Sequence, residues 1–218
     1  MKLEQHVLKA IDDFGQNHLD SSLMNACLAI DATARNTYGE NRRKVGSHYK
    51  KCIRNYYWIF EPMIGGGFDF KDLRFNNLRL DNGYGELISN PDLADVIWHI
   101  FRCSHAHAKE VPLNYELLQT EDGKSPWEIG TDTLKMPQRV IWALLAISVF
   151  AKANSTIKTK GGHFLIWGSE TLGLGNWKFI VHDWWGKEDE FKAFLAEKNP
   201  SPTRVKLEGL DKLITVSV

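Results

Sequence analysis

Three polar side chains within one short stretch could do acid–base and phosphate chemistry together. The sequence RCSHAH holds Arg102, His105 and His107. A histidine with its ordinary pKa of about 6.5 can act as a base or as an acid near neutral pH. An arginine is permanently charged, and its forked N–H groups match the oxygens of a phosphate. These three residues are therefore the candidate catalytic residues of the chain.

The stretch lies at the end of a predicted helix. The sequence NPDLAD predicts its start, with Asn90 as the cap and Pro91 at the first helical position. At about 100° per residue, Arg102 points away from the apolar face and forms an exposed ridge with His99 and His105. The apolar face itself has spacings of three and four, at Leu93, Val96, Ile97, Ile100, Phe101 and Ser104.

On a regular helix His107 lies about 140° from Arg102, too far round for both to act on one group. The pair therefore requires the helix to end near residues 104–106, or a second subunit to supply one member. We expect a homodimer for this reason. A structural alternative stays open, because histidines at a helix end often bond free carbonyls and an outward arginine is often only solvated.

Other chemistries are less favoured by the same residues. On a helix His105 and His107 are about 200° apart, and no carboxylate stands nearby at a ligand spacing, so we expect no metal. The chain has no GxSxG, P-loop or dinucleotide-binding fingerprint, and we expect no cofactor.

Arg102, four residues and then His107 resemble the R-x4–6-H motif of the HEPN superfamily. The segments CLAIDATARNTYG and MPQRVIWALLAISVFAKAN are similar to helices that flank the motif, and the resemblance covers residues 19–155. It implies an all-α bundle and a metal-independent ribonuclease. In that ribonuclease Arg102 stabilises the phosphorane, His107 moves a proton, and His105 is a second proton carrier. Cys103 departs from the polar residue usual after the arginine and favours a catalytically silent binding module.

A run of basic residues suggests a polyanionic partner such as RNA. Between positions 42 and 54 there are six Lys or Arg residues and no acid, in a chain of zero net charge. Aromatic residues at 56–58 follow directly and could stack on bases. The alternative is a solvated helix face with its aromatics in the core. The candidate nucleic-acid-binding residues are Arg43, Lys44, Lys50, Lys51 and Arg54.

The periodicity predicts a mainly α chain, α+β overall, in two parts. A HEPN-like helical bundle occupies residues 1–155, with helices at 3–14, from 20 or 21 to 36, 47–60, from 90, and 137–154. A short hairpin is expected within 72–80. A small β-rich subdomain, 156–218, is expected to dock on the bundle with both faces of its sheet covered. Its elements are strands at 163–168, 177–184, 203–208 and 214–218, and a helix at 187–198.

Composition limits the cellular setting. Hydrophobic residues make up 43% of 218 residues, enough for a substantial core. Three cysteines without a CxxC spacing fit reduced thiols, and the first residues lack a secretory apolar region. The longest apolar run, 140–151, is shorter than the roughly 20 residues that a bilayer needs. We therefore expect a cytoplasmic protein with no membrane contact, and a protein partner stays possible.

Overall fold

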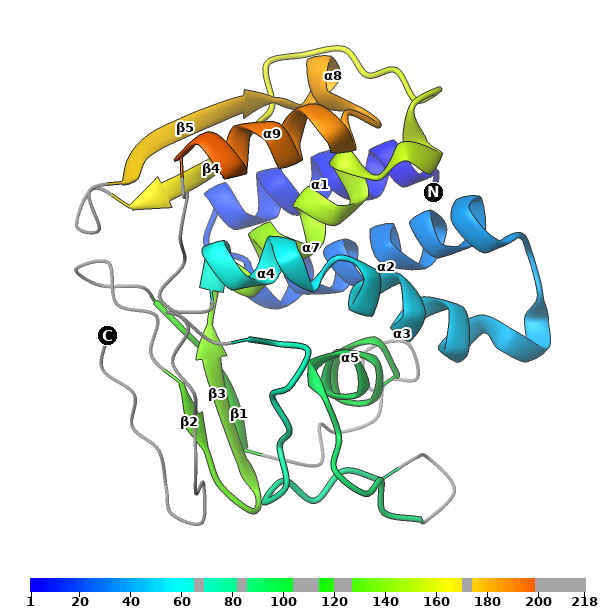
Figure 1. Ribbon diagram of the computed structural model, residues 1–218, viewed down its shortest axis with the longest axis vertical. Coiled ribbons are helices and arrows are strands. Elements are labelled where there is room, and N and C mark those ends of the chain that lie inside the picture. Colours follow the sequence, from blue (N-terminus) through cyan, green and yellow to red (C-terminus); the bar gives the residue numbers. More distant parts are fainter. Residues whose placement is uncertain (65–68, 82–85, 104–113, 120–126, 170–173, 199–218) are drawn as a thin grey trace.

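The computed structural model describes residues 1–64, 69–81, 86–103, 114–119, 127–169 and 174–198. The predicted mainly helical class with a smaller β component is confirmed (Figure 1). The helices are α1 Leu3–Gly15, α2 Leu19–Tyr38, α3 Val45–Asn55, α4 Tyr57–Ile64, α5 Leu93–Val96, α7 Arg139–Phe150, α8 Val181–Trp184 and α9 Glu188–Lys198. Two 3-10 turns, Arg42–Lys44 and Lys152–Asn154, and a π-helix, Ile97–Cys103, complete the helical segments.

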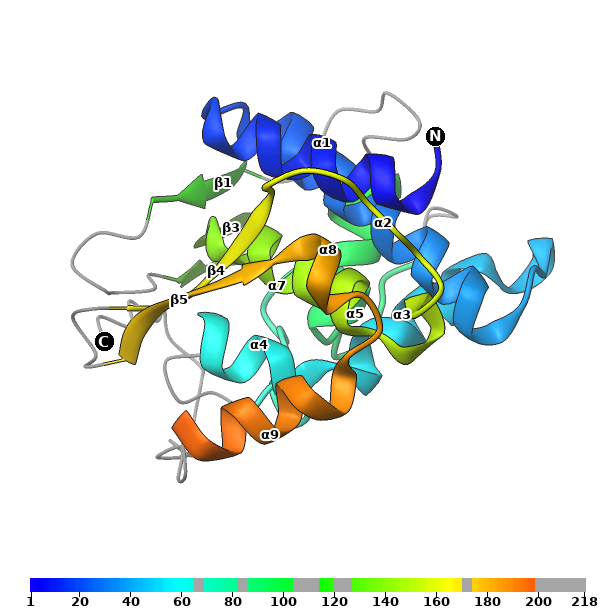
Figure 2. The same ribbon diagram turned by 90° about the horizontal axis from the view of Figure 1, so that it is seen from above.

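Helix α7 is the centre of the core. It is apolar on nearly every side, and ten of its residues are buried, as expected of a helix surrounded by protein. Helix α2 packs on one side of it and α4 on the other (Figure 2). No described helix combines the length and apolar character that a membrane crossing requires.

A buried amide joins the end of α7 to α2. Asn154 is fully buried, and its Nδ2 donates to Thr33 Oγ1 at 3.0 Å and to the carbonyl of Ser148 at 2.7 Å. Asn36 Nδ2 donates in turn to Asn154 Oδ1 at 2.8 Å. Because a buried amide costs free energy unless it is hydrogen-bonded, these bonds fix where the chain leaves α7.

Two of the predicted helix boundaries in the helical body differ from the structure, besides the start of α5, which is described with the site below. The helix expected over 47–60 is divided at Tyr56, whose ψ of 19° ends α3 before α4 begins. The helix expected to begin at Pro137 begins at Arg139, because Pro137 is the last residue of a strand.

A three-stranded sheet lies at the opposite end of the molecule from the hairpin β4–β5 (Figure 1). Its strands are β1 Asn114–Leu118, β2 Glu128–Ile129 and β3 Thr133–Pro137 in the order β1-β3-β2, with β1 and β3 parallel. The hairpin predicted within 72–80 is wrong. Residues 76–77 do form a turn, but the only pairing described near them is a bridge between Asp81 and Leu87.

The tail packs on the helical body through aromatic residues. Strands β4 Phe164–Ser169 and β5 Leu174–Ile180 form an antiparallel hairpin, and the predicted helix at 187–198 is present as α9. The Phe191 ring stacks on Phe150 of α7, with centroids 3.7 Å apart, and meets Phe179 of β5 edge-on. The Tyr56 hydroxyl donates to Glu188 at 2.7 Å. The division at residue 155 stays a prediction.

One expectation for the tail is wrong: the strand expected over 177–184 ends at Ile180, and Val181–Trp184 forms α8. Among the described residues one face of the hairpin is covered, while the other presents Phe164, Ile166 and Ile180, each 37–43% exposed. The expected cover of this second face stays a prediction. The predicted strands at 203–208 and 214–218 lie outside the described residues.

A substitution at Gly186 tests the packing of the tail on the helical body. Its φ is +75°, and a Cβ there would lie 2.4 Å from Ser155 Cα, while its N–H donates to the carbonyl of Val149 at 2.8 Å. Gly186→Ala should lower the free energy of unfolding by about 2 kcal/mol or more, because both the backbone and the space oppose a side chain. Gly162→Ala, where a Cβ meets nothing, is the matched control. Equal denaturant midpoints for the two variants would contradict this packing.

Candidate functional site

Arg102 lies on the π-helix that continues α5. A π-helix has i→i+5 hydrogen bonds and therefore turns less per residue than an α-helix. Over this segment the difference directs Arg102 toward α2, where its Nη2 donates to Asp31 Oδ2 at 2.9 Å. Only 20% of the Arg102 side chain is exposed. His99 is half-buried, and burial lowers its pKa. For Arg102 and His99 the predicted exposed ridge is therefore wrong, whereas the apolar face is buried as predicted up to Phe101.

The start of this helix also differs from the prediction. Asp92, and not Asn90, is the cap: its carboxylate accepts from the N–H of Asp95 at 3.0 Å, and Asp95 accepts from the N–H of Asp92 at 3.3 Å. This reciprocal arrangement is a capping box. Asn90 has a φ of 53° and lies in the turn before the cap.

The ring of Trp98 packs against the guanidinium of Arg102. The Arg102 guanidinium carbon lies 5.5 Å from the centroid of the Trp98 ring, within cation–π range. Gly46 of α3 allows the ring to come this close to the helix, because a Cβ at Gly46 would lie 2.9 Å from Trp98 Cζ2. Tyr49 packs against the same ring, with centroids 5.0 Å apart.

A buried carboxylate requires this arginine. Asp31 is 8% exposed on the core-facing side of α2, next to the fully buried Tyr49. Burial raises the pKa of the Tyr49 hydroxyl well above its ordinary value; the Asp31 charge adds to the rise and Arg102 opposes it. Because an unpaired buried charge is strongly unfavourable, Arg102 has a structural role as the partner of Asp31. Its buried Nε has no hydrogen-bond partner among the described residues.

Arg102 also lines a pocket of about 230 Å³ between the end of α2 and the start of α3. Three further basic side chains line it: Arg35 from α2, Arg42 from the 3-10 turn, and His48 from α3. Within the described part of the chain, Arg35 and Arg42 form no ion pair. Asp31 is held by Arg102, and Glu40 is the other carboxylate in the lining. We call this cavity the Arg102 pocket; Ala34, Gly39, Asn41 and Val45 complete its lining.

The other two candidate catalytic residues, His105 and His107, lie outside the described residues. The prediction that Arg102 and His107 lie close enough to act on one group, on which the sequence-based site depends, therefore stays a prediction. His48 is the histidine that the described residues bring to the Arg102 pocket.

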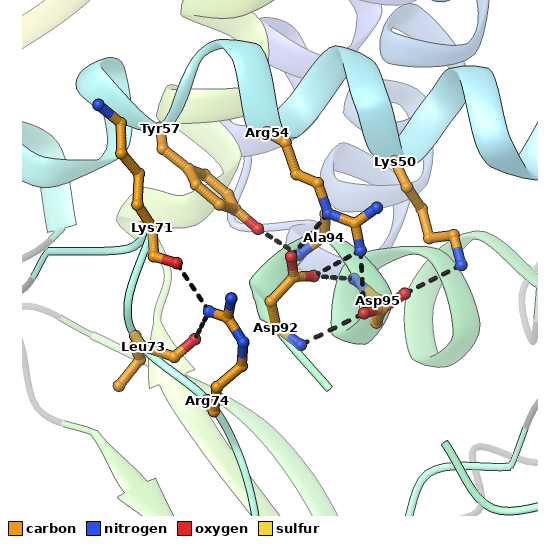
Figure 3. A network of polar contacts seen from close by, with 9 residues as sticks. All are labelled: Lys50, Arg54, Tyr57, Lys71, Leu73, Arg74, Asp92, Ala94 and Asp95. Atoms are coloured by element: carbon orange, nitrogen blue, oxygen red, sulfur yellow. Dashed lines mark hydrogen bonds and ion pairs between the residues drawn. The ribbon is translucent and has the colours of Figure 1, made fainter. Parts of the chain in front are cut away.

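The five candidate nucleic-acid-binding residues do not form one free basic surface. Arg43 and Lys44 are exposed on the 3-10 turn, and the ammonium of Lys51 lies 5.0 Å from the centroid of the Tyr38 ring. Lys50 instead pairs with Asp95 at 2.9 Å, and Arg54 pairs with both Asp92 and Asp95 (Figure 3). Acids distant in sequence thus compensate two of the five cations.

The residues that sequence reasoning missed are Asp31, Arg35 and His48. A carboxylate on the apolar face of a predicted buried helix signals a buried cation partner, and Asp31 has this pattern, four residues after Cys27. The partner itself could not be read from the sequence, because it lies 71 residues away. Among the residues that the structure describes, no group of three His, Cys, Asp or Glu could hold a metal ion.

Comparison of the sequence with known proteins shows its family. The family model Rv1289 matches residues 2–210. The chain is 27% identical over 195 residues to each of two relatives, which covers 88% of this chain and 86% of the relative. They are described as the uncharacterized proteins Rv1289 of Mycobacterium tuberculosis (strain ATCC 25618 / H37Rv) and Mb1320 of Mycobacterium bovis. No solved structure matches the chain.

The Arg102–Asp31 pair should show strong energetic coupling. In a double-mutant cycle of Asp31→Asn and Arg102→Gln, each single variant leaves a mostly buried partner uncompensated, so we expect a coupling free energy of about 1–3 kcal/mol in urea unfolding. The matched control is the cycle of Lys152 and Asp189, an exposed pair at 2.9 Å. It should show no measurable coupling, and similar coupling in both cycles would be inconsistent with a buried pair.

The Asp92 network predicts a specific acid sensitivity. Burial alone would raise the pKa of Asp92, but hydrogen bonds from Arg54 and from the N–H of Asp95 lower it to about 2. A carboxyl whose pKa is lowered by folding stabilises the protein above its unfolded pKa, near 4, and this contribution disappears as the pH falls toward 2. Asp92→Asn should therefore be less stable at pH 7 but lose less stability across that window. Equally steep losses in urea unfolding would contradict the assignment.

Proposed function

The chain belongs to the Rv1289 family, and for this member we propose a metal-independent endoribonuclease in which Arg102 binds the scissile phosphate. The observation that carries the proposal is the Arg102 pocket, in which Arg35 and Arg42 are unpaired with any described carboxylate. Three guanidinium groups around one cavity favour an oxyanion. At about 230 Å³ the pocket is smaller than sites for whole drug-sized ligands, which begin near 300 Å³. It therefore suits one phosphate group of a longer molecule.

The proposed reaction is attack by the RNA 2′-hydroxyl on the neighbouring phosphorus. A base removes the 2′-hydroxyl proton, the new O–P bond gives a phosphorane, and the bond to the 5′-oxygen breaks as an acid protonates that oxygen. The products are a 2′,3′-cyclic phosphate and a free 5′-hydroxyl. No metal is required, because the guanidinium of Arg102 stabilises the charge that develops on the phosphorane.

The proposed proton carriers are histidines. We assign His107 as the principal base or acid and His105 as the second, following the R-x4–6-H resemblance. His48 lines the Arg102 pocket and is a further imidazole that a bound phosphodiester could reach. Asp31 is a positioning residue, because it holds Arg102 in the pocket wall.

The same proposal includes a HEPN-like arrangement of the helices and a homodimer. The central apolar α7 and the arginine-bearing helix beside α2 support such a bundle. A dimer would bring histidines of one subunit toward Arg102 of the other. A cytoplasmic location stays a prediction.

A second candidate function is the catalytically silent HEPN-like binding module, whose ligand the sequence leaves open and for which we propose RNA. The Arg102–Asp31 ion pair favours it, because a carboxylate at 2.9 Å already uses part of the positive charge that a phosphorane needs. The two functions share the phosphate-binding pocket and differ only in cleavage.

An RNA assay with excess EDTA separates the two. The purified protein should cleave single-stranded RNA and leave cyclic phosphate ends, whereas the module would shift the RNA in a gel without cutting it. If the protein neither binds nor cuts RNA, both functions are wrong.

Variants connect the activity to the pocket. His107→Ala should lower cleavage about 100-fold or more, because a lost proton carrier costs this much. Arg102 needs a charge-balanced variant, Asp31→Asn/Arg102→Gln, because removal of the arginine alone would leave the buried Asp31 carboxylate without its partner. The double variant should lose cleavage about 100-fold, while Arg79→Gln, an exposed arginine outside the pocket, should keep it. Retained cleavage in the double variant would assign the activity to another site or to a contaminant.

A further inference from the structure

A second cavity, separate from the Arg102 pocket, lies at the other end of α3, where Arg54 lines it. Its volume is about 450 Å³, within the 300–1,000 Å³ range of sites for small molecules. One wall is the start of α5 with its capping residues, and the other is the segment 69–75. The lining residues are Arg54, Tyr57, Lys71, Arg74, Asn90, Asp92 and Asp95. They are polar apart from the Tyr57 ring, so the cavity suits a polar ligand.

The two walls are fixed relative to each other. The N–H of Phe75 donates to the carbonyl of Pro91 at 2.8 Å, which ties the segment 69–75 to the residue before the helix cap. Phe70 and Phe75 are buried on either side of Arg74. The Asp69 carboxylate accepts from the N–H of Lys71 at 3.0 Å and so closes the turn that carries Lys71. The cavity is therefore formed before any ligand binds.

Arg74 presents a preorganised donor edge to this cavity. Its Nη1 donates to the carbonyls of Lys71 and Leu73, both at 2.8 Å. Figure 3 shows that these bonds turn the guanidinium toward Asp92 and Tyr57. Its Nε and Nη2 make no hydrogen bond within the described residues, so one complete fork remains for an oxyanion. Because the side chain is already held in place, binding costs less conformational entropy.

The charges also favour an anion. Asp92 and Asp95 face the cavity, but Arg54 and Lys50 already pair with them. Lys71 and Arg74 are exposed and form no ion pair in the part of the chain that the structure describes. Two cations thus remain without a compensating charge. A ligand with two negative charges on one group matches them better than a single carboxylate does.

We propose that this cavity binds the phosphate group of a small polar molecule, with Arg74 as its bidentate contact and Lys71 as a second cation. Asn90 at the rim supplies an amide for the remainder of the ligand. Arg54 and Asp92 are positioning residues, because their mutual bonds at 2.6 and 3.1 Å keep the Asp92 carboxylate neutralised.

Calorimetric titration with inorganic phosphate tests the proposal. The titration uses the Arg35→Gln/Arg42→Gln chain, which removes the two unpaired cations of the Arg102 pocket and leaves Arg102 paired with Asp31, so that this pocket does not contribute to binding. Arg74→Gln in this background should weaken phosphate binding by about tenfold, the loss of one charge-assisted pair of hydrogen bonds. Lys71→Gln should weaken it less. Acetate, which carries one charge, should bind more weakly than phosphate.

The matched control is Arg79→Gln, which removes an exposed arginine of the same part of the chain without altering the cavity. It should bind phosphate as the background does, and thermal melting should show all variants folded. Two results would overturn the proposal: no saturable phosphate binding in the background, or the same affinity in the Arg74→Gln/Lys71→Gln variant. Because the Arg102 pocket is disabled throughout, neither result depends on the ribonuclease proposal.

Discussion

The ion pair between Asp31 and Arg102 is the interaction around which this protein's helical body is arranged. A carboxylate on the buried side of α2 is unfavourable unless a cation reaches it. Arg102 supplies that cation from a helix 71 residues later in the chain. The guanidinium that neutralises the buried Asp31 carboxylate also lines the Arg102 pocket. Core stability and the phosphate recognition that we propose therefore depend on the same side chain, and a substitution of Arg102 tests both at once.

Several neighbouring features position the Arg102 side chain next to Asp31. The π-helix sets the direction of the Arg102 side chain, because it turns less per residue than an α-helix. Such segments are rare in proteins and often occur at functional sites. Gly46 lets Trp98 pack over the guanidinium. At the other end of the same helix, Arg54 holds the cap residue Asp92 and joins α5 to α3. The positive charges around the two pockets thus have two roles: Arg54 and Arg102 hold this helix in place. The cations that remain available are Arg35, Arg42, Lys71 and Arg74.

The sequence predicts the elements better than the contacts between them. The helices α1, α2, α7 and α9 and the strand β4 follow from periodicity, because each has a regular apolar pattern. The sheet β1-β3-β2 was missed, since its strands are five residues or shorter and β1 pairs in parallel across a long connection. Arg102 was identified by its type, but its direction was wrong because the rotation of an α-helix was assumed. The partners Asp31 and Asp92 depend on contacts that only the folded chain defines.

Nuclear magnetic resonance of the arginine side chains tests the central claim most directly. The Arg102 Nε–H signal should exchange slowly with water in the free protein, because this nitrogen is buried. On titration with an RNA oligonucleotide whose 2′-hydroxyls are replaced by hydrogen, so that it cannot be cut, the signals of Arg102, Arg35 and Arg42 should shift together, while that of Arg79 should not. Unchanged Arg102, Arg35 and Arg42 signals at saturating RNA would contradict a phosphate-binding role for this pocket.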